Sequence, residues 1–303
     1  MLIVTLLLVA LAGSAGYALG YEWAGIPFAL VLAVLLGSGS YFGGDRLVLA
    51  ASDAHEIDRA NPPDATRQLM NVVEEMRLAS GLPMPRVHVI PDTAPNAFAT
   101  GRDPKHASLA VTAGLLEKLD REELQGVIAH EMSHVRNLDI RFMLLIGVMV
   151  GTIALLADWF LRISFWGGLG GGRRSGGDRD GGGALLALIA VVALLLSVIS
   201  PIIGRLVMLA ASRRREGLAD VSAVELTRNP LGLAGALRKI ADDPEVLEVA
   251  NKATQHLYIV NPIKAYEERS RSMWDTHPPL GERIRVLEEL AGASGAPLAP
   301  GHG

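Results

Sequence analysis

The residues His130-Glu131-Met132-Ser133-His134 fit the pattern H-E-x-x-H. Residues four apart lie on one face of an α-helix, so both imidazoles can reach a single metal ion. Glu131 projects beside the first ligand, where it can take a proton from a water molecule that the metal activates. The pattern predicts a zinc site with His130 and His134 as ligands and Glu131 as general base. The alternative is a solvated helix with two ordinary histidines.

A third ligand is needed, because catalytic zinc takes three protein ligands and keeps one position open for water. The chain has no cysteine, and no histidine follows at the spacing H-E-x-x-H-x-x-G-x-x-H. A carboxylate is therefore expected, and the strongest candidate is Glu216. It shares a helix face with Asp220, four residues on. The alternative is that both acids pair with the preceding arginines as a surface ion-pair cluster.

The elements that must position these residues include four apolar runs. Half of the 303 residues are hydrophobic, and the runs are Met1–Tyr21, Trp23–Gly44, Phe142–Leu161 and Gly181–Gly204. Each has the ~20 residues that a helix needs to cross ~30 Å of hydrocarbon. We expect four transmembrane helices, and a cleaved signal peptide is the alternative for the first run. The placement of arginines favours a cytoplasmic location for the polar parts and for both termini.

The last two runs are expected to bring the ligands together. His134 precedes Phe142 by about 12 Å along a continuous helix, and Glu216 follows the fourth run by about 8 to 18 Å. Because neighbouring spans run antiparallel, both motifs emerge on one side of the membrane. The sequence therefore predicts a site about a nanometre above the bilayer.

The polar parts are expected to form a mainly α-helical fold with a small β-sheet. We expect helices near residues 53–58, after Pro62-Pro63 and after a capping box at Asp120 and Glu123, and strands at residues 86–90, 96–100 and 108–112. The expected organisation is a transmembrane hairpin (1–44), a first catalytic part (45–141), a second hairpin (142–204) with a Gly-rich loop (167–183), a second catalytic part (205–291) and a disordered tail (292–303).

These motifs resemble those of the HtpX-type membrane zinc metallopeptidases and, more distantly, the CAAX prenyl proteases. The matching stretches are Asn96-Ala97-Phe98-Ala99-Thr100-Gly101-Arg102, Ala110–Leu116, His130–His134 running into Asn137 and Asp139, Arg215–Asp220, and Thr276-His277-Pro278-Pro279-Leu280 ending at Arg283-Ile284. They occur in order from about residue 45 to 290. The Gly-rich loop and Gly217, where relatives often carry a larger side chain, depart from the family pattern.

The resemblance implies a gluzincin-like site with one zinc ion per chain. It implies that Glu216 is the third ligand, that Asp220 is a second-shell or proton-donating acid, and that His277 takes part at the metal. The segment Asn96, Ala97, Phe98 and Ala99 would be an edge strand that pairs with extended substrate. From the residues alone, His277 is equally well an ordinary loop histidine, and the segment an ordinary core strand.

The expected function is that of a zinc endopeptidase in the plasma membrane, with its catalytic part facing the cytoplasm. The family suggests polypeptide substrates, chiefly misfolded membrane proteins, in quality control. A net charge of −4 offers no basic surface for nucleic acid. The alternatives are a non-catalytic membrane chaperone or scaffold, and a site-2-type intramembrane protease. The polar residues that surround the H-E-x-x-H motif argue against the second.

Overall fold

The computed structural model describes residues 25–142, 214–245 and 279–293, together with residues 191, 195, 198, 199 and 202. The chain divides into two compact units, residues 1–41 with 145–208 and residues 42–144 with 209–303. The expected Gly-rich loop, residues 294–303 of the expected tail and His277 lie outside the described residues. So do the first apolar run and most of the third and fourth. Residues 292 and 293 are helical and not part of a disordered tail.

The first described element is α2, Gly25–Ala51, which covers most of the second apolar run. Among the described residues, no helix reaches the length and hydropathy that define a membrane span. The C-terminal end of α2 is fastened to the sheet of the second unit. Arg86 Nη2 donates to Asp45 Oδ2 at 2.8 Å, and Leu49 packs in a small apolar cluster with Ile90 and Phe98.

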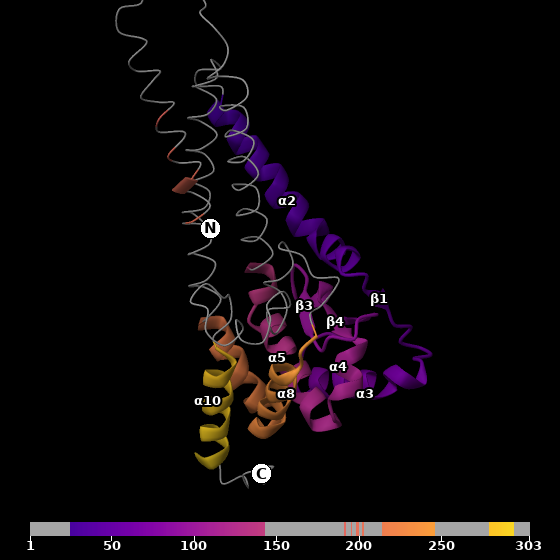
Figure 1. Ribbon diagram of the computed structural model, residues 1–303. Helices are drawn as coiled ribbons and strands as arrows, with labels where there is room; N and C mark the ends of the chain where they lie inside the picture. Colours follow the sequence, from indigo (N-terminus) through magenta and orange to yellow (C-terminus); the bar gives the residue numbers. More distant parts are fainter. Residues whose placement is uncertain are drawn as a thin grey trace, which may run out of the picture. The chain divides into compact units, whose positions relative to one another are not determined.

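A four-stranded sheet supports the site (Figure 1). Its strands are β1 (His55–Glu56), β2 (Arg86–Ile90), β3 (Ala97–Thr100) and β4 (Ser108–Thr112), in the order β1-β2-β4-β3. Strands β2 and β4 run parallel, and β1 and β3 are antiparallel to their neighbours. The short 3-10 helix η2 (Pro104–His106) connects β3 to β4. The three predicted strands are confirmed, and β3 lies at an edge.

The helix expected near residues 53–58 is wrong, because the chain forms β1 there. Helix α2 ends at Ala51, and Asp53 takes a positive φ of 49° that turns the chain. The backbone N–H of Ile57 then donates to the Val87 carbonyl at 2.9 Å. Pairing with β2 satisfies the backbone of this segment, which overrides its local helical pattern.

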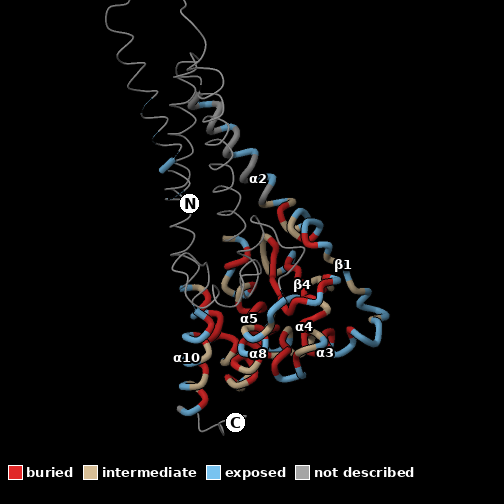
Figure 2. Tube along the Cα trace, in the orientation of Figure 1, coloured by how far each residue is buried: buried red, intermediate tan, exposed pale blue. Residues whose placement is uncertain are grey.

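The helices that follow are α3 (Asp64–Ser80), α4 (Ala113–Lys118) and α5 (Arg121–Arg136). Helix α3 buries Leu69, Val72, Val73 and Met76, as their helical spacing predicts. The capping box of α5 is confirmed: Asp120 accepts from the Glu123 N–H, and the Glu123 side chain accepts from the Asp120 N–H. Figure 2 shows buried residues along α5 and in β3 and β4, so the helix with the H-E-x-x-H motif lies in the core.

The second catalytic part contributes a helix at residues 214–227, then α8 (Pro230–Asp242) and α10 (Leu280–Ala293). Helix α8 packs against both α5 and α10. The α5–α8 contact is close because Gly126 faces the α8 backbone, where an added Cβ would lie 2.6 Å from the Leu233 nitrogen. This glycine lets the two parts of the sequence approach each other.

We therefore predict that Gly126→Ala lowers the free energy of unfolding by about 1–3 kcal/mol, because the methyl group overpacks the α5–α8 contact. Thermal unfolding followed by circular dichroism measures the effect. The matched control is Gly217→Ala, since a Cβ at Gly217 meets nothing within 4 Å. The control should gain up to about 1 kcal/mol from helix propensity. Equal stability of the two variants would contradict the packing argument.

Candidate metal centre

Three side chains from two helices converge on one point. His130 and His134 come from α5 and Glu216 from helix 214–227, and one potential ligand atom of each lies within 4.8 Å of the others. The two Nε2 atoms are 3.2 Å apart. Glu216 Oε2 lies 3.5 Å from His130 Nε2, and Glu216 Oε1 lies 3.4 Å from His134 Nε2. The three residues predicted as ligands therefore lie together, and they could hold a metal ion.

Burial excludes the surface ion-pair alternative for the two acids. Glu216 and Asp220 are only 5% and 4% exposed. Asp220 pairs with Arg283 of α10, 63 residues away in the sequence, and Arg215 pairs with Asp139. The acids thus belong to the interior of the site.

Each histidine is held through its other ring nitrogen by a buried aspartate. His130 Nδ1 lies 2.9 Å from Asp220 Oδ1, and His134 Nδ1 lies 3.0 Å from Asp139 Oδ2. A carboxylate at Nδ1 favours the tautomer that carries its proton there, which leaves the Nε2 lone pair for a metal. Both Nε2 atoms then point to the Glu216 carboxylate.

Each aspartate is in turn paired with an arginine. Arg283 is buried and makes two bonds to Asp220, Nε to Oδ2 at 2.9 Å and Nη2 to Oδ1 at 2.7 Å. Arg215 Nη1 bonds Asp139 Oδ1, and its guanidinium lies 4.2 Å from the centre of the Phe142 ring. Asp139 and Arg283 lie in the stretches that resemble the family, but their pairing around the histidines was not predicted from the sequence. The charged side chains of these two residues were the features of the sequence that could have indicated their part in the site.

The expected continuous helix from His134 to Phe142 is wrong. Helix α5 ends at Arg136, Leu138 takes a left-handed φ of 59°, and the helix resumes at Asp139. In an unbroken helix, residues five apart point about 140° away from each other. The break at Leu138 is therefore what returns the Asp139 carboxylate to His134.

The charges of the cluster shift its pKa values. Burial disfavours protonated His134, but Asp139 and Glu216 outweigh burial and raise its pKa to about 10. Burial likewise opposes protonation of His130, and the hydrogen bonds to Asp220 and Glu216 raise its pKa. Burial disfavours ionised Asp220, yet Arg283 and His130 lower its pKa to about 2. The site therefore attracts positive charge at both histidines and keeps Asp220 ionised.

Glu131 lies beside the cluster and is almost fully buried. Burial raises its pKa, and the two neighbouring histidines partly oppose that shift. The backbone N–H of Ala99 donates to its carboxylate. Strand β3 thus contacts the predicted base directly, which links the edge of the sheet to the site.

The four residues predicted to bind substrate have different surroundings. Asn96 is buried, accepts through its backbone carbonyl from the Thr112 N–H at 3.0 Å, and caps the Ala97 N–H with its own Oδ1 at 3.0 Å. Ala97 and Ala99 pack in the main core, whereas Phe98 packs in the second cluster with Leu49. The Phe98 side chain therefore points to the other face of the sheet.

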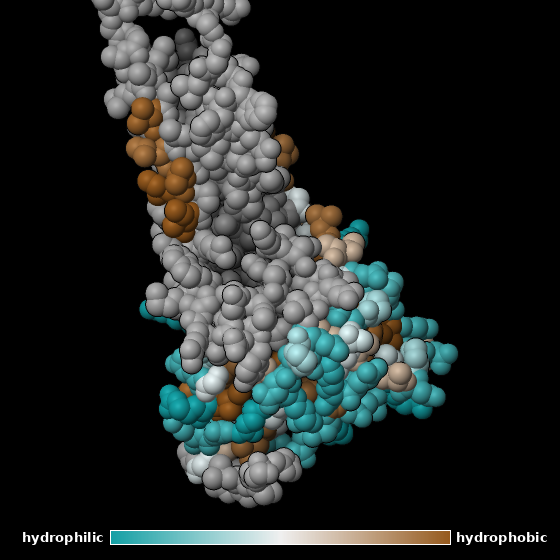
Figure 3. Space-filling view, in the orientation of Figure 1, coloured by the Kyte–Doolittle hydropathy of each residue, from teal (hydrophilic) through white to brown (hydrophobic). Residues whose placement is uncertain are grey.

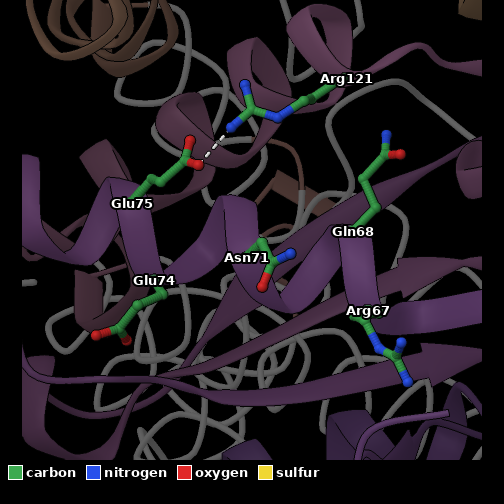
Figure 4. Close-up of a pocket in the computed structure, with 6 residues that line it drawn as sticks. All are labelled: Arg67, Gln68, Asn71, Glu74, Glu75 and Arg121. Atoms are coloured by element: carbon green, nitrogen blue, oxygen red, sulfur yellow. Dashed lines mark hydrogen bonds and ion pairs between the residues drawn. The ribbon is translucent and has the colours of Figure 1, made fainter. Parts of the chain in front are cut away.

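A separate pocket lies on α3 and the start of α5 (Figure 4). Its six lining residues are Arg67, Gln68, Asn71, Glu74, Glu75 and Arg121. Arg121 bonds Glu75 across it, and Glu74 accepts from Arg77 at 2.7 Å. Its charged side chains form ion pairs at the surface, with one another or with neighbours on α3, so it resembles a solvated helix face more than a reactive site.

We predict that Asp139→Asn weakens metal binding by about 10–100-fold, the usual cost of losing a carboxylate behind a metal-binding histidine. Competition with a chromogenic chelator measures the dissociation constant. The control is Asp64→Asn, because the Asp64 side chain is 90% exposed. Unchanged affinity in the Asp139 variant would remove Asp139 from the site.

We also predict that metal affinity increases with pH between 6 and 8. The metal needs neutral His134, but a pKa of about 10 keeps the metal-free imidazole protonated over this whole range. Binding must release that proton, so the association constant should rise about tenfold per pH unit. Titrations at pH 6, 7 and 8 test this, and an affinity independent of pH would contradict it.

Comparisons with known proteins identify relatives of this sequence. The model of peptidase family M48 matches residues 63–291. A "Protease HtpX homolog" of Caldanaerobacter subterraneus is 42% identical over 272 residues, 89% of this chain and 87% of its own length. Another, of Lactiplantibacillus plantarum, is 44% identical over 280 residues, 91% of each chain.

Among solved structures, the crystal structure of S. mikatae Ste24p is similar with a TM-score of 0.47 and 17% identity. The match covers 86% of this chain and 57% of that one. The family model and the sequence relatives extend over both catalytic parts, including every described residue of the metal centre. The chain belongs to peptidase family M48 and is a metalloprotease that hydrolyses peptide bonds.

Proposed function

We propose that the protein is a zinc-dependent endopeptidase, with His130, His134 and Glu216 as the ligands of one zinc ion. Two ligands of a tetrahedral zinc, each about 2.0–2.1 Å from the metal, lie about 3.3 Å apart. The three separations of 3.2, 3.4 and 3.5 Å are close to that value. This convergence beside Glu131 is the observation that carries the proposal.

Glu131 is proposed as the general base. Zinc supplies Lewis-acid catalysis, polarising the scissile carbonyl and making a water molecule acidic near neutral pH. The Glu131 carboxylate accepts the proton of that water and passes it to the leaving amine. Burial raises its pKa towards the range in which a carboxylate accepts a proton readily, and the Ala99 N–H holds it in place.

Asp220 is proposed to position His130. With a pKa of about 2 and two bonds from Arg283, its carboxylate stays ionised at neutral pH. That state suits an acceptor for the Nδ1 proton of His130 and not a proton donor to a leaving group. We propose that His277, which lies outside the described residues, helps to stabilise the oxyanion that forms on the scissile carbonyl.

We propose that the substrate pairs as an extended strand with the edge of the sheet. The Asn96 carbonyl bonds β4, so by the alternation of an antiparallel pair Ala97 and Ala99 direct their backbone groups away from β4. The Ala99 N–H is next to the base. The roles of Asn96 and Phe98 would be structural, because the Asn96 side chain hydrogen-bonds to the backbone and the Phe98 side chain packs in the core.

The proposed setting is the plasma membrane, with the catalytic part facing the cytoplasm and misfolded membrane proteins as substrates. The four apolar runs and the arginine placement support it. The relatives named as HtpX homologues are proteases, which disfavours the non-catalytic scaffold. The polar residues Arg136, Asn137 and Asp139 beside the motif disfavour an intramembrane site.

The decisive test compares wild type with Glu131→Gln and Glu216→Ala in detergent. Glu131→Gln should keep one zinc per chain and lose cleavage of casein, because it lacks only the base. Glu216→Ala should lose both, because a ligand is missing. Metal content by mass spectrometry and a chelator-sensitive cleavage assay give the two readings.

The matched control is Glu117→Gln, an exposed residue of α4. It should retain both metal and activity. Normal proteolysis by Glu131→Gln would exclude Glu131 as the base. Full zinc occupancy in Glu216→Ala, with unchanged affinity, would exclude the proposed ligand set.

A further inference from the structure

Three large apolar side chains are exposed next to the metal centre. Leu218 and Val221 lie one turn apart on helix 214–227 and are 53% and 50% exposed, and Leu138 is 43% exposed. The opposite face of the same helix carries the buried residues Glu216 and Asp220. We call Leu138, Leu218 and Val221 the apolar patch.

Ion pairs on both sides of Leu138 connect this turn to helix 214–227. Arg136 lies 3.8 Å from Glu225, and Asp139 bonds Arg215. Leu138 lies between Arg136 and Asp139 in the sequence. Leu218 and Val221 lie between their partners, Arg215 and Glu225. These two contacts place the turn at Leu138 beside helix 214–227, which carries Leu218 and Val221.

Leucine at position 138 strains the backbone. Its φ of 59° lies in the left-handed region, which glycine and asparagine adopt with less strain. At 43% exposure, its side chain also forgoes a large part of the stabilisation that full burial would give. In Figure 3 the visible surface of the described catalytic parts is mainly hydrophilic, so exposed apolar side chains are the exception there.

The surroundings of the patch fit a lipid surface. Four exposed arginines flank the apolar patch in the described sequence: Arg136, which pairs with Glu225, and Arg141, Arg214 and Arg228. Arginines attract anionic headgroups, and leucine and valine enter the acyl boundary. The third apolar run begins at Phe142, four residues after Leu138.

The area of the patch also favours lipid over a protein partner. Three side chains at these exposures offer on the order of 300 Å². A standard protein interface buries about 800 Å² on each partner. An apolar centre of this size with a cationic rim matches an interfacial membrane contact better.

We propose that the apolar patch inserts into the interfacial layer of the bilayer, so that the helix carrying Glu216 lies at the lipid surface. The inference rests on the proposed membrane anchoring. It goes further by placing the metal centre at the bilayer surface and not about a nanometre above it. Substrate segments would then be cleaved where they leave the membrane.

The absence of cysteine in the chain allows single nitroxide labels without background. The full-length protein with Glu131→Gln is reconstituted in phosphatidylcholine vesicles containing phosphatidylglycerol, and labels are attached at Leu218→Cys or Val221→Cys. The matched aqueous control is Leu78→Cys, on α3 and 65% exposed. Leu195→Cys, within the fourth apolar run, reports the anchoring itself.

Power saturation compares collisions of each label with oxygen and with chromium oxalate. The expected result is an oxygen preference at positions 218 and 221 several-fold above that at position 78, larger with phosphatidylglycerol than without it. This inference alone would be overturned if the labels at 218 and 221 were as accessible to chromium oxalate as the label at 78, while the label at 195 was in lipid. Aqueous readings at 195, 218 and 221 would overturn the anchoring as well.

A polypeptide contact gives a different pattern. If labels at 218 and 221 are accessible in empty vesicles and become protected only when unfolded casein is added, the patch binds substrate and the lipid proposal is wrong. The Glu131→Gln background prevents cleavage during this measurement. Protection that is complete before casein is added supports the lipid contact.

Discussion

The balance of charge in a buried space is the constraint on which the site depends. Four buried carboxylates, Glu131, Asp139, Glu216 and Asp220, lie around two imidazoles. Among the described residues, the guanidiniums of Arg215 and Arg283 pair with Asp139, Asp220 and Glu216. Both imidazole Nε2 atoms face the Glu216 carboxylate, and this is a negative group that a bound cation would balance. Since unpaired buried charge is costly, the cluster favours a metal ion strongly, and the raised pKa values of both histidines express the same preference for positive charge.

The two arginines do more than neutralise charge. A carboxylate that carried a proton would be a poor acceptor for Nδ1–H and would leave the histidine free to change tautomer. Arg283 keeps Asp220 ionised, with a pKa of about 2, and so fixes His130 with Nε2 towards Glu216. Arg283 belongs to α10, which packs on α8, and α8 packs on α5. The closeness of α5 and α8 at Gly126 thus helps to set the geometry of the metal centre.

Local patterns predicted much of the fold and the centre of the site. Helical spacing identified the H-E-x-x-H face, alternation identified the three longer strands, and Asp120 with Glu123 identified the start of α5. The features that were not predicted depend on contacts between distant parts of the sequence or on irregular backbone conformations. Residues 55–56 form a strand because they hydrogen-bond to β2. The Arg283–Asp220 pair joins residues 63 positions apart in the sequence, and no periodic pattern indicates it. The role of Asp139 required a left-handed residue that helix propensity does not predict.

That left-handed residue joins two properties of the molecule. The break at Leu138 returns Asp139 to His134, and it also leaves the leucine side chain exposed beside Leu218 and Val221. A glycine or asparagine at this position would orient Asp139 with less strain but would remove the apolar side chain. A contact between the Leu138 side chain and a partner outside the described fold would explain why leucine occupies this position. A lipid surface offers that contact at the point where the chain leaves the metal centre for its third apolar run.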